Sequence, residues 1–401
     1  MAAANIARKL VVTPAELKER IVAIAREAGA GAVAIAPADD DLRTRERFDA
    51  AIARGDLATW PYDAEHVERA TSPRALLPGA KSVVCIAVPY ATGPPPGRGP
   101  LTGRFSNYAW AADYHRHVRA ILRRIAGALD EIAGKPATRV VCDTAPLAER
   151  AFAERAGLGW IGKHTNLIAP GLGSYLFLGE IVTTLELPPD RSSKKTCGSC
   201  TRCIDVCPTG ALRGDYTIDA TRCISDLTQR SDPIPREMRP LLGDWVWGCD
   251  LCQEVCPPTR RASVRADRAF AASNANAAFP DLMMLLTLRR GEYRRRFRPT
   301  AMGWRGPAVL RRNAAVALGN SLDRAAVPAL ERSLGEDASE LVRGHAAWAL
   351  GRIGSPRARR TLEGRLAGES SLSVREEIVA ALGSKGYPSQ VRDSMTRGKM
   401  G

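Results

Sequence analysis

Eight of the ten cysteines lie between Cys197 and Cys256, in a pattern that is typical of iron–sulfur proteins. The first half, from Cys197 to Cys207, reads C-x2-C-x2-C-x3-C-P. In this run three thiolates bind one 4Fe–4S cluster and the fourth thiolate reaches another cluster. The second half, from Cys249 to Cys256, reads C-x2-C-x3-C-P and is preceded by Cys223. We therefore predict two 4Fe–4S clusters that relay electrons.

Each cluster is expected to be bound by four of these eight cysteines. Under the crossover rule, cluster 1 takes Cys197, Cys200, Cys203 and Cys256, while cluster 2 takes Cys207, Cys223, Cys249 and Cys252. The alternative is a pair of four-cysteine zinc sites, because C-x2-C pairs also bind structural zinc. The order x2, x2, x3-Pro occurs in its essentials in both halves, which favours the clusters. Since four thiolates saturate each cluster, electron relay is favoured over substrate binding.

The rest of the sequence is consistent with a protein that folds in a reducing compartment. Cys85 and Cys142 lie in apolar strand-like runs and are expected to be buried hydrophobic residues. The segment Met1–Val12 contains charged residues and lacks the long apolar run of an export signal. No later window has about 18 uninterrupted apolar residues, so we expect no membrane span. A cytoplasmic metalloprotein is the resulting prediction.

The segments before the cysteines show strand and helix patterns in turn. Thr13-Pro14-Ala15-Glu16 has the order of a capping box and begins a helix that is predicted to run to Glu27. Further helices are expected at 113–132 and 146–156, and strands at 33–36, 81–90, 139–143 and 174–187. Residues 91–104 are rich in proline and glycine and predict an irregular surface loop or lid. Residues 1–190 are therefore predicted to form an α/β domain.

The C-terminal part carries an internal repeat. The pairs Leu318-Gly319, Leu350-Gly351 and Leu382-Gly383 follow one another at a spacing of 32 residues. Such a period indicates stacked helical hairpins of the HEAT kind, with an ordinary helical cap as the alternative. The predicted fold class is a multidomain α+β and α/β protein. It has an α/β domain (1–190), a two-cluster ferredoxin-like module (191–265) and an α-helical HEAT-like domain (266–401).

The formal net charge of +15 indicates attraction to polyanions, and much of it has a location. Nine arginines but only one acid, Glu292, lie between Arg289 and Arg312. Tyr293, Phe297 and Trp304 are interleaved with them, an arrangement suited to phosphate contacts and base stacking. A solvated helix face is the alternative. The predicted RNA-binding residues are Arg289, Arg290, Arg294, Arg295, Arg296, Arg298 and Arg312.

Several motifs together resemble the epoxyqueuosine reductase family. They are the stretch from Cys142 to Asn166, the segments Gly173-Ser174-Tyr175 and Leu178-Gly179-Glu180, and the cysteine run that follows. The resemblance also covers Asp113-Tyr114-His115, the segment 222–228 and the HEAT-like tail, so it extends over nearly the whole chain. It implies a cobalamin-dependent oxidoreductase that removes the epoxide oxygen from epoxyqueuosine at the wobble position of tRNA.

The resemblance gives Asp143 the role of proton donor. Asp143 closes a predicted strand just before a helix, where α/β folds present reactive groups. Because a free Asp is ionised at neutral pH, a donor there is expected to be buried in an apolar pocket that raises its pKa. The alternative is that Asp143 caps the helix that begins near Pro146.

The resemblance also implies a base-off cobalamin in the N-terminal domain, between the clusters and the substrate. A lower histidine ligand has no support, because Asp113-Tyr114-His115 does not continue as the D-x-H-x-x-G signature. The positions that match the family near the cofactor are Arg69, Ser106, Asp113, Tyr114, His115, Asp143, Lys163, His164, Leu167 and Ser225. Arg69 and Lys163 have an alternative as solvated surface charges, and His115 as a packed helix residue.

The expected reaction passes single electrons from an external low-potential donor through the clusters to cobalt, and the expected substrate is tRNA that carries epoxyqueuosine. We expect a monomer. One alternative is another cobalamin-dependent reductase of the dehalogenase kind, against which the missing export signal and the arginine-rich tail argue. The other is a ferredoxin-type electron carrier with a HEAT arm that docks a partner protein.

Overall fold

The computed structural model describes residues 13–58, 60, 62–263 and 266–383, so Met1–Val12 lies outside the described residues. The chain forms two compact units. Unit 1 comprises Met1–Thr92, Asp113–Thr221 and Leu251–Phe270, and unit 2 comprises Gly93–Ala112, Arg222–Asp250 and Ala271–Gly401. Both units are built from non-consecutive segments, which differs from three consecutive domains; the bounds at 190 and 265 stay predictions.

Unit 1 is built on a four-stranded sheet of order β1-β2-β7-β4. The strands are β1 (Ala32–Pro37), β2 (Ser82–Pro89), β4 (Thr138–Val141) and β7 (Leu176–Thr183). All three pairings are antiparallel. Asp143 follows the last residues of β4 and precedes α6, as predicted, although the sheet is antiparallel.

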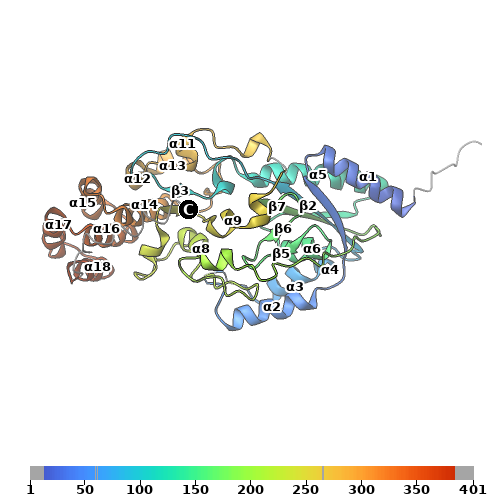
Figure 1. The fold of residues 1–401 in the computed structure, drawn as a ribbon, viewed down its shortest axis with the longest axis horizontal. Coiled ribbons are helices and arrows are strands. Elements are labelled where there is room, and N and C mark those ends of the chain that lie inside the picture. Colours follow the sequence, from blue (N-terminus) through green and yellow to red (C-terminus); the bar gives the residue numbers. More distant parts are fainter. Residues whose placement is uncertain (1–12, 59, 61, 264–265, 384–401) are drawn as a thin grey trace, which may run out of the picture. The chain divides into compact units, whose positions relative to one another are not determined.

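Helices cover both faces of this sheet. Helix α1 (Pro14–Glu27) begins with the predicted capping box of Thr13 and Glu16. It packs beside α5 (Tyr114–Ala133), which contacts β4 and β7 (Figure 1). Helix α6 (Glu149–Arg155) contacts β1, β2 and β7. The predicted apolar stripe of α5 is buried from Val118 to Leu129. All the strands and helices predicted for this part are present, with shifts of a few residues at their ends.

The remaining elements of unit 1 are short. Three helices precede β2 in the chain: α2 (Leu42–Ala53), α3 (Ala64–Thr71) and α4 (Pro73–Leu76). Four more lie within or after the cysteine segment: α7 (Arg202–Asp205), α9 (Leu251–Glu254), α10 (Pro257–Arg260) and η3 (Arg268–Phe270). A small hairpin is formed by β5 (Trp160–Ile161) and β6 (Leu167–Ile168). The four-stranded sheet and the cysteines from Cys197 to Cys207 thus belong to the same unit.

Unit 2 joins the proline-rich loop to the helical part of the chain. The loop is irregular, as predicted, up to β3 (Arg104–Phe105), which pairs in parallel with β8 (Trp245–Trp247). This pairing explains why residues 93–112 group with unit 2. The shorter elements here are η1 (Asn107–Ala109), α8 (Ile224–Gln229), η2 (Arg239–Leu242), α11 (Ala275–Ala278), α12 (Leu282–Leu286), α13 (Arg290–Arg296) and η4 (Arg324–Ala326).

Five longer helices form the C-terminal stack of unit 2. They are α14 (Pro307–Ser321), α15 (Val327–Glu336), α16 (Glu340–Ile353), α17 (Pro356–Leu366) and α18 (Leu372–Gly383). Helices α14, α16 and α18 pack in series and each carries one Leu-Gly pair. A Cβ on Gly319 would lie 2.9 Å from Cα of Ala349, and one on Gly351 would lie 2.9 Å from Cα of Ala381. The repeated glycines thus permit close approach of neighbouring helices.

We expect Gly351→Ala to lower the stability of the stack, although alanine has the higher helix propensity. The added methyl meets the backbone of α18, and overpacking of this kind costs about 1–3 kcal/mol. Gly364→Ala is the matched control, because Gly364 is exposed on α17 with no atom near its missing Cβ. That control should gain up to about 1 kcal/mol. Thermal unfolding followed by circular dichroism compares the two; equal midpoints would contradict the packing role.

No helix in the described part of the chain is both long and apolar enough to cross a lipid bilayer.

Candidate functional site

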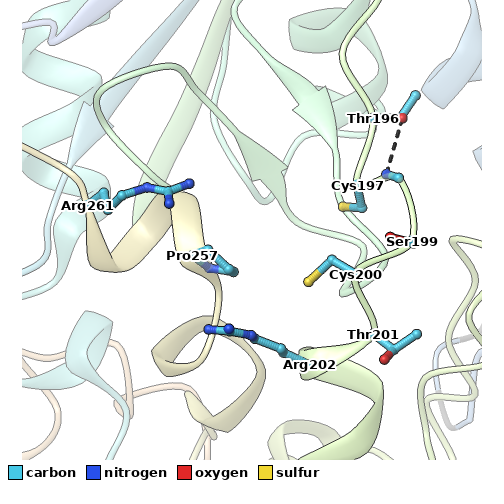
Figure 2. A pocket seen from close by; sticks show the side chains of 9 residues that line it. Thr196, Cys197, Ser199, Cys200, Thr201, Arg202, Pro257 and Arg261 are labelled. Atoms are coloured by element: carbon cyan, nitrogen blue, oxygen red, sulfur yellow. Dashed lines mark hydrogen bonds between the residues drawn. The ribbon is translucent and has the colours of Figure 1, made fainter.

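Four cysteines from the two ends of the cysteine segment lie together in unit 1: Cys197, Cys200, Cys203 and Cys256. Burial, together with the neighbouring thiols Cys197, Cys256 and Cys200, raises the pKa of Cys203 to about 11. The sulfurs of Cys197 and Cys200 face a hollow of about 710 Å³ whose opposite side includes Pro257, the residue after Cys256 (Figure 2). The structure therefore brings together the four residues that were predicted to bind cluster 1.

The surroundings of these thiols suit an iron–sulfur cluster. Cys256 and Cys197 pack with Trp160 and Ile168 in an apolar group. The backbone N–H of Lys163 donates to Sγ of Cys197 at 3.4 Å, and the buried indole N–H of Trp160 has no acceptor among the described residues. Thiolate ligands, apolar cover and N–H donors to sulfur are the features that hold and tune 4Fe–4S clusters. The residues present thus fit this cofactor.

Two further observations concern the cysteine loop and the binding of single metal ions. The ammonium of Lys163 donates to the carbonyls of Gly198 (2.9 Å) and Cys200 (3.1 Å), so this side chain anchors the cysteine loop. Its role near a cobalamin stays a prediction. Within the described residues, no three His, Cys, Asp or Glu side chains are arranged to bind a single metal ion.

The predicted ligands of cluster 2 belong to both units. Cys207 and Cys252 are part of unit 1, whereas Cys223 and Cys249 are part of unit 2. All four are half-buried, and none of them forms a disulfide. Their grouping as one ligand set stays a prediction.

The second group of polar residues in unit 1 surrounds Asp143. This residue lies in the loop between β4 and α6 with a positive φ of 53°. Its carboxylate oxygen Oδ2 is 2.9 Å from Nε2 of His115, and Nδ1 of His115 is 2.6 Å from Oδ1 of Asp113. Asp113 also caps α5 by accepting the N–H of His115. The structure thus brings three predicted site residues into one hydrogen-bonded row, Asp113–His115–Asp143.

This row changes the expected source of the proton. The side chain of Asp143 is 53 % exposed, so the predicted apolar pocket is wrong. Asp143 does not cap a helix either, since α6 begins six residues later and its N-cap is Ala148. The hydrogen bond to Asp143 and the hydrogen bond to Asp113 raise the pKa of His115, against the effect of burial. A protonated His115 beside Asp143 can therefore supply protons near neutral pH.

Aromatic rings line the same region. Tyr114 stacks on Phe177 with ring centroids 4.0 Å apart and on His115 at 4.2 Å. Phe177 in turn stacks on Tyr90 at 4.2 Å. The sequence identified Tyr114 but missed Tyr90 and Phe177, because alternating aromatic residues at strand ends look like ordinary core residues.

The other positions predicted near a cobalamin are distributed over both units. In unit 1, Arg69 forms an exposed ion pair with Glu65 and Leu167 is buried in the core. In unit 2, the hydroxyl of Ser106 is buried and donates to Asp250, and Ser225 accepts a hydrogen bond from Gln229. The side chains of Leu167 and Ser106 thus have partners inside the protein.

His164 gives the clearest structural sign of a missing polar partner. Its side chain is buried, and Nδ1 accepts the N–H of Asn166 at 3.2 Å. Burial lowers the pKa of His164 to about 4, so the ring is neutral and its proton lies on Nε2. Nε2 is buried and has no acceptor within the described residues. An amide carbonyl of a corrin side chain would supply one, so the residues present fit a cobalamin.

The basic segment of unit 2 is only partly available to a ligand. Six predicted arginines are exposed on and around α13: Arg289, Arg290, Arg294, Arg295, Arg296 and Arg298. Arg312 is wrong as an RNA contact, because it is fully buried and donates to the carbonyls of Leu227 and Asp232. Tyr293 and Phe297 are also buried and cannot stack on a base. They point into the core because the α13 helix places them one turn apart on its inner face.

Three family models match parts of the chain. They are described as "Epoxyqueuosine reductase QueG, DUF1730" (residues 70–144), "4Fe-4S double cluster binding domain" (196–259) and "HEAT repeats" (305–383). The third match confirms the predicted helical repeats, and the second supports the reading of the cysteines as cluster ligands rather than zinc ligands.

Curated relatives and solved structures agree with these models. The epoxyqueuosine reductase of Bacillus cereus is 33 % identical over 82 % of this chain and 87 % of its own length. That of Xanthomonas campestris is 37 % identical over 82 % of this chain and 94 % of its own. A crystal structure of an epoxyqueuosine reductase bound to an epoxyqueuosine-modified tRNA-Tyr stem loop is 33 % identical. It covers 92 % of this chain and 99 % of its own, with a TM-score of 0.85.

Proposed function

Since the chain belongs to the epoxyqueuosine reductase family, we propose that it reduces epoxyqueuosine to queuosine at the wobble position of tRNA, with electrons that pass through two 4Fe–4S clusters to a bound cobalamin. The chain is an oxidoreductase of this family. One observation carries the proposal furthest. A half-exposed acid, Asp143, is hydrogen-bonded to His115 in the same unit as four gathered cysteine thiols.

The chemistry requires two electrons and two protons for each epoxide. Removal of the oxygen as water leaves an alkene, so a source of electrons and a source of protons must both reach the substrate. When bound, the clusters and cobalamin supply the electrons, one at a time, from an external low-potential donor. In our proposal the cluster 1 thiols hold their cluster against Trp160, and His164 donates Nε2–H to a corrin amide.

The proton steps belong to the chain's own residues. In the resting site His115 donates its Nε2–H to Oδ2 of Asp143, and the hydrogen bond between Nδ1 of His115 and Asp113 fixes the orientation of the imidazole ring. We propose that a proton moves from His115 to Asp143 and from Asp143 to the epoxide oxygen as the carbon–oxygen bond breaks. General acid catalysis of this kind contributes about 10²–10⁴-fold to rate. The exposed side chain of Asp143 suits this role, because the acid must touch a substrate that arrives from solution.

The tRNA is proposed to contact the exposed arginines of α13 and its flanks. Among the described residues, only Arg296 of the six forms a salt bridge, with Glu292 at 2.8 Å. The others keep their charge for a ligand. Phosphate contacts position RNA, and their strength depends on salt. The proposed location is the cytoplasm, where tRNA is modified and iron–sulfur clusters persist. The protein is proposed to act as a monomer.

We expect the triple substitution Arg294→Gln, Arg295→Gln, Arg298→Gln to weaken tRNA binding by about tenfold or more and to reduce the slope of log K against log salt by about 2. The reason is the loss of phosphate contacts and of the counterions that they release. Filter binding or fluorescence anisotropy at several salt concentrations measures both quantities.

A matched control removes the same charge elsewhere on unit 2. Arg324, Arg332 and Arg360 are exposed and form no salt bridge with another described residue. Their triple replacement by glutamine should leave the slope nearly unchanged. Equal effects of the two triple variants would show that net charge, rather than the α13 surface, governs binding.

A cellular experiment tests the proposed function. Bacterial cells that lack their own epoxyqueuosine reductase accumulate the epoxide nucleoside in tRNA. Expression of this chain should replace epoxyqueuosine by queuosine in nucleoside digests of that tRNA. Persistence of the epoxide in cells that contain soluble, iron-loaded protein would contradict the proposal.

A further inference from the structure

Two carboxyl groups lie behind the loop that carries Asp143. Glu180 is in the centre of β7, is completely buried, and pairs in register with Cys85 of β2 and Val141 of β4. Glu149 is the first residue of α6, and its Oε1 accepts the backbone N–H of Asp143 at 2.5 Å. Asp143 and Glu149 are thus joined by a hydrogen bond, and Glu180 lies on the sheet behind them.

The surroundings of Glu180 cannot hold a second negative charge. Neither of its oxygens has a donor among the described residues. Helix α6, whose first residue is Glu149, packs on β7, and burial, followed by the charge and the side-chain hydrogen bond of Glu149, raises the pKa of Glu180 well above the usual value. A buried carboxylate beside another carboxylate is strongly unfavourable unless a proton lies between them.

The other ionisable groups near the pair do not remove this conflict. Glu149 is influenced by the charges of Asp143, Arg150 and His115, and burial raises its pKa to about 7. The thiols of Cys85 and Cys142 also lie beside the two carboxyls, and burial raises the pKa of each thiol. Both thiols are therefore neutral. The charge of Arg150 lowers the pKa of Glu149, but its guanidinium donates to the carbonyl of Thr165 at 2.8 Å.

We propose that Glu149 and Glu180 share one proton in the active enzyme and act as positioning residues, in which Glu180 donates to Glu149 and Glu149 holds the backbone N–H of Asp143. The inference rests on the proposed function, since it explains how the proton donor of that reaction is kept in place. Asp143 has a left-handed backbone that a non-glycine residue adopts only when its surroundings fix it. The Glu149 hydrogen bond is the contact that fixes this backbone, and it aims the Asp143 side chain at His115.

The proposal has a consequence for the pH dependence. When the pH rises far enough to remove the shared proton, two charges are left side by side, the pair separates, and Asp143 is released. Loss of the proton on His115 also lowers activity at high pH, so the wild-type profile alone does not separate the two causes. The substitution Glu180→Gln separates these two causes. The new glutamine amide donates to Glu149 at every pH, while His115 is unchanged.

Infrared spectroscopy of the resting protein gives the first test and needs no turnover. Wild-type protein with its clusters, but without substrate, should show the carbonyl stretching band of a protonated carboxylic acid at neutral pH. This band should be absent from Glu180→Gln. If the band is missing from the wild type, or persists in Glu180→Gln, the shared proton does not exist and the proposal is overturned.

Steady-state kinetics gives the second test. Glu180→Gln should keep kcat within about twofold at neutral pH and lose much of the alkaline decline. Glu149→Leu should lower kcat by about 10²-fold, as expected for a displaced catalytic group, with KM and iron content unchanged. Glu149→Gln should restore most of that loss, since its amide oxygen accepts the Asp143 N–H. An unchanged alkaline limb in Glu180→Gln, or normal kcat in Glu149→Leu, would overturn the positioning role.

The two tests also separate this inference from the proposed function. If wild-type protein with clusters and cobalamin produces no queuosine, the proposed function fails, whereas the infrared band still decides whether the proton is shared. If Glu149→Leu does not fold, Glu180→Leu offers a second comparison. It removes the donor and leaves the Glu149 carboxylate unsupported, and it should show the same loss of kcat without loss of iron.

Discussion

Asp143→Asn is expected to lower turnover of epoxyqueuosine tRNA by about 10³-fold, while both clusters and the tRNA affinity remain. Asparagine has the shape of aspartate, and its amide oxygen can still accept the hydrogen bond from Nε2 of His115. It cannot deliver a proton to the epoxide oxygen. The loss should therefore appear in kcat with KM nearly unchanged. Single-turnover assays with nucleoside analysis measure it.

Two comparison variants make this result specific. Asp113→Asn should cause a smaller loss, because Asp113 orients His115 and helps to raise its pKa but does not meet substrate. Asp323→Asn changes a helix-capping acid of unit 2 and should leave turnover unchanged. Turnover by Asp143→Asn within a few fold of the wild type would remove Asp143 as the proton donor.

Cys203→Ala is expected to abolish turnover and to lower the bound iron by about half, since one four-iron cluster would lose a ligand. Cys203 is buried among the other three thiols of its set, so no nearby side chain replaces it. Iron and sulfide analysis of anaerobically reconstituted protein measures the cluster content. Electron paramagnetic resonance after reduction shows which signal is lost.

The matched control for this substitution is Cys85→Ala. Cys85 is completely buried in β2 and lies in the apolar core of the sheet, away from the cysteine segment. This variant should keep its full iron content, apart from a modest loss of stability. Full iron content in Cys203→Ala would contradict the assignment of Cys203 to a cluster.

The sequence predicts most of the elements because their signals are local. The capping box at Thr13 and Glu16 begins α1 as expected, and the apolar stripe from Val118 to Leu129 is the buried face of α5. The spacing of the Leu-Gly pairs predicts the repeats, and the structure supplies the reason, since Gly319 and Gly351 lie where helix backbones nearly touch. Cysteine spacing likewise predicts the cluster 1 ligands as one set, because that spacing is dictated by the cofactor.

Features that depend on contacts distant in the sequence were not predictable. The antiparallel pairing of β2 with β7 joins residues that are 87 to 101 positions apart, and the pairing of β3 with β8 joins residues that are 141 to 142 positions apart. Arg312 has the local context of a surface charge, yet it is buried and bonded to backbone carbonyls of residues 227 and 232. Glu180 lies in an apolar run whose pattern gives no sign that its carboxyl meets Glu149.

The proton donor shows the same division between local and distant information. The motif around Asp143 identifies the residue, but the expected apolar pocket does not exist. Its partner His115 comes from the beginning of α5, and its backbone is held by α6. Only the folded chain brings these three segments together, so the way in which His115 and Glu149 contact Asp143 could not be derived from the motif alone.

The most direct test is turnover by the purified protein. Anaerobically reconstituted wild-type protein should be mixed with a chemical reductant, cobalamin and tRNA that carries epoxyqueuosine, followed by nucleoside analysis. We predict queuosine in the complete mixture and none when cobalamin or reductant is omitted. Absence of queuosine from the complete mixture, with clusters and cobalamin bound, would contradict the account.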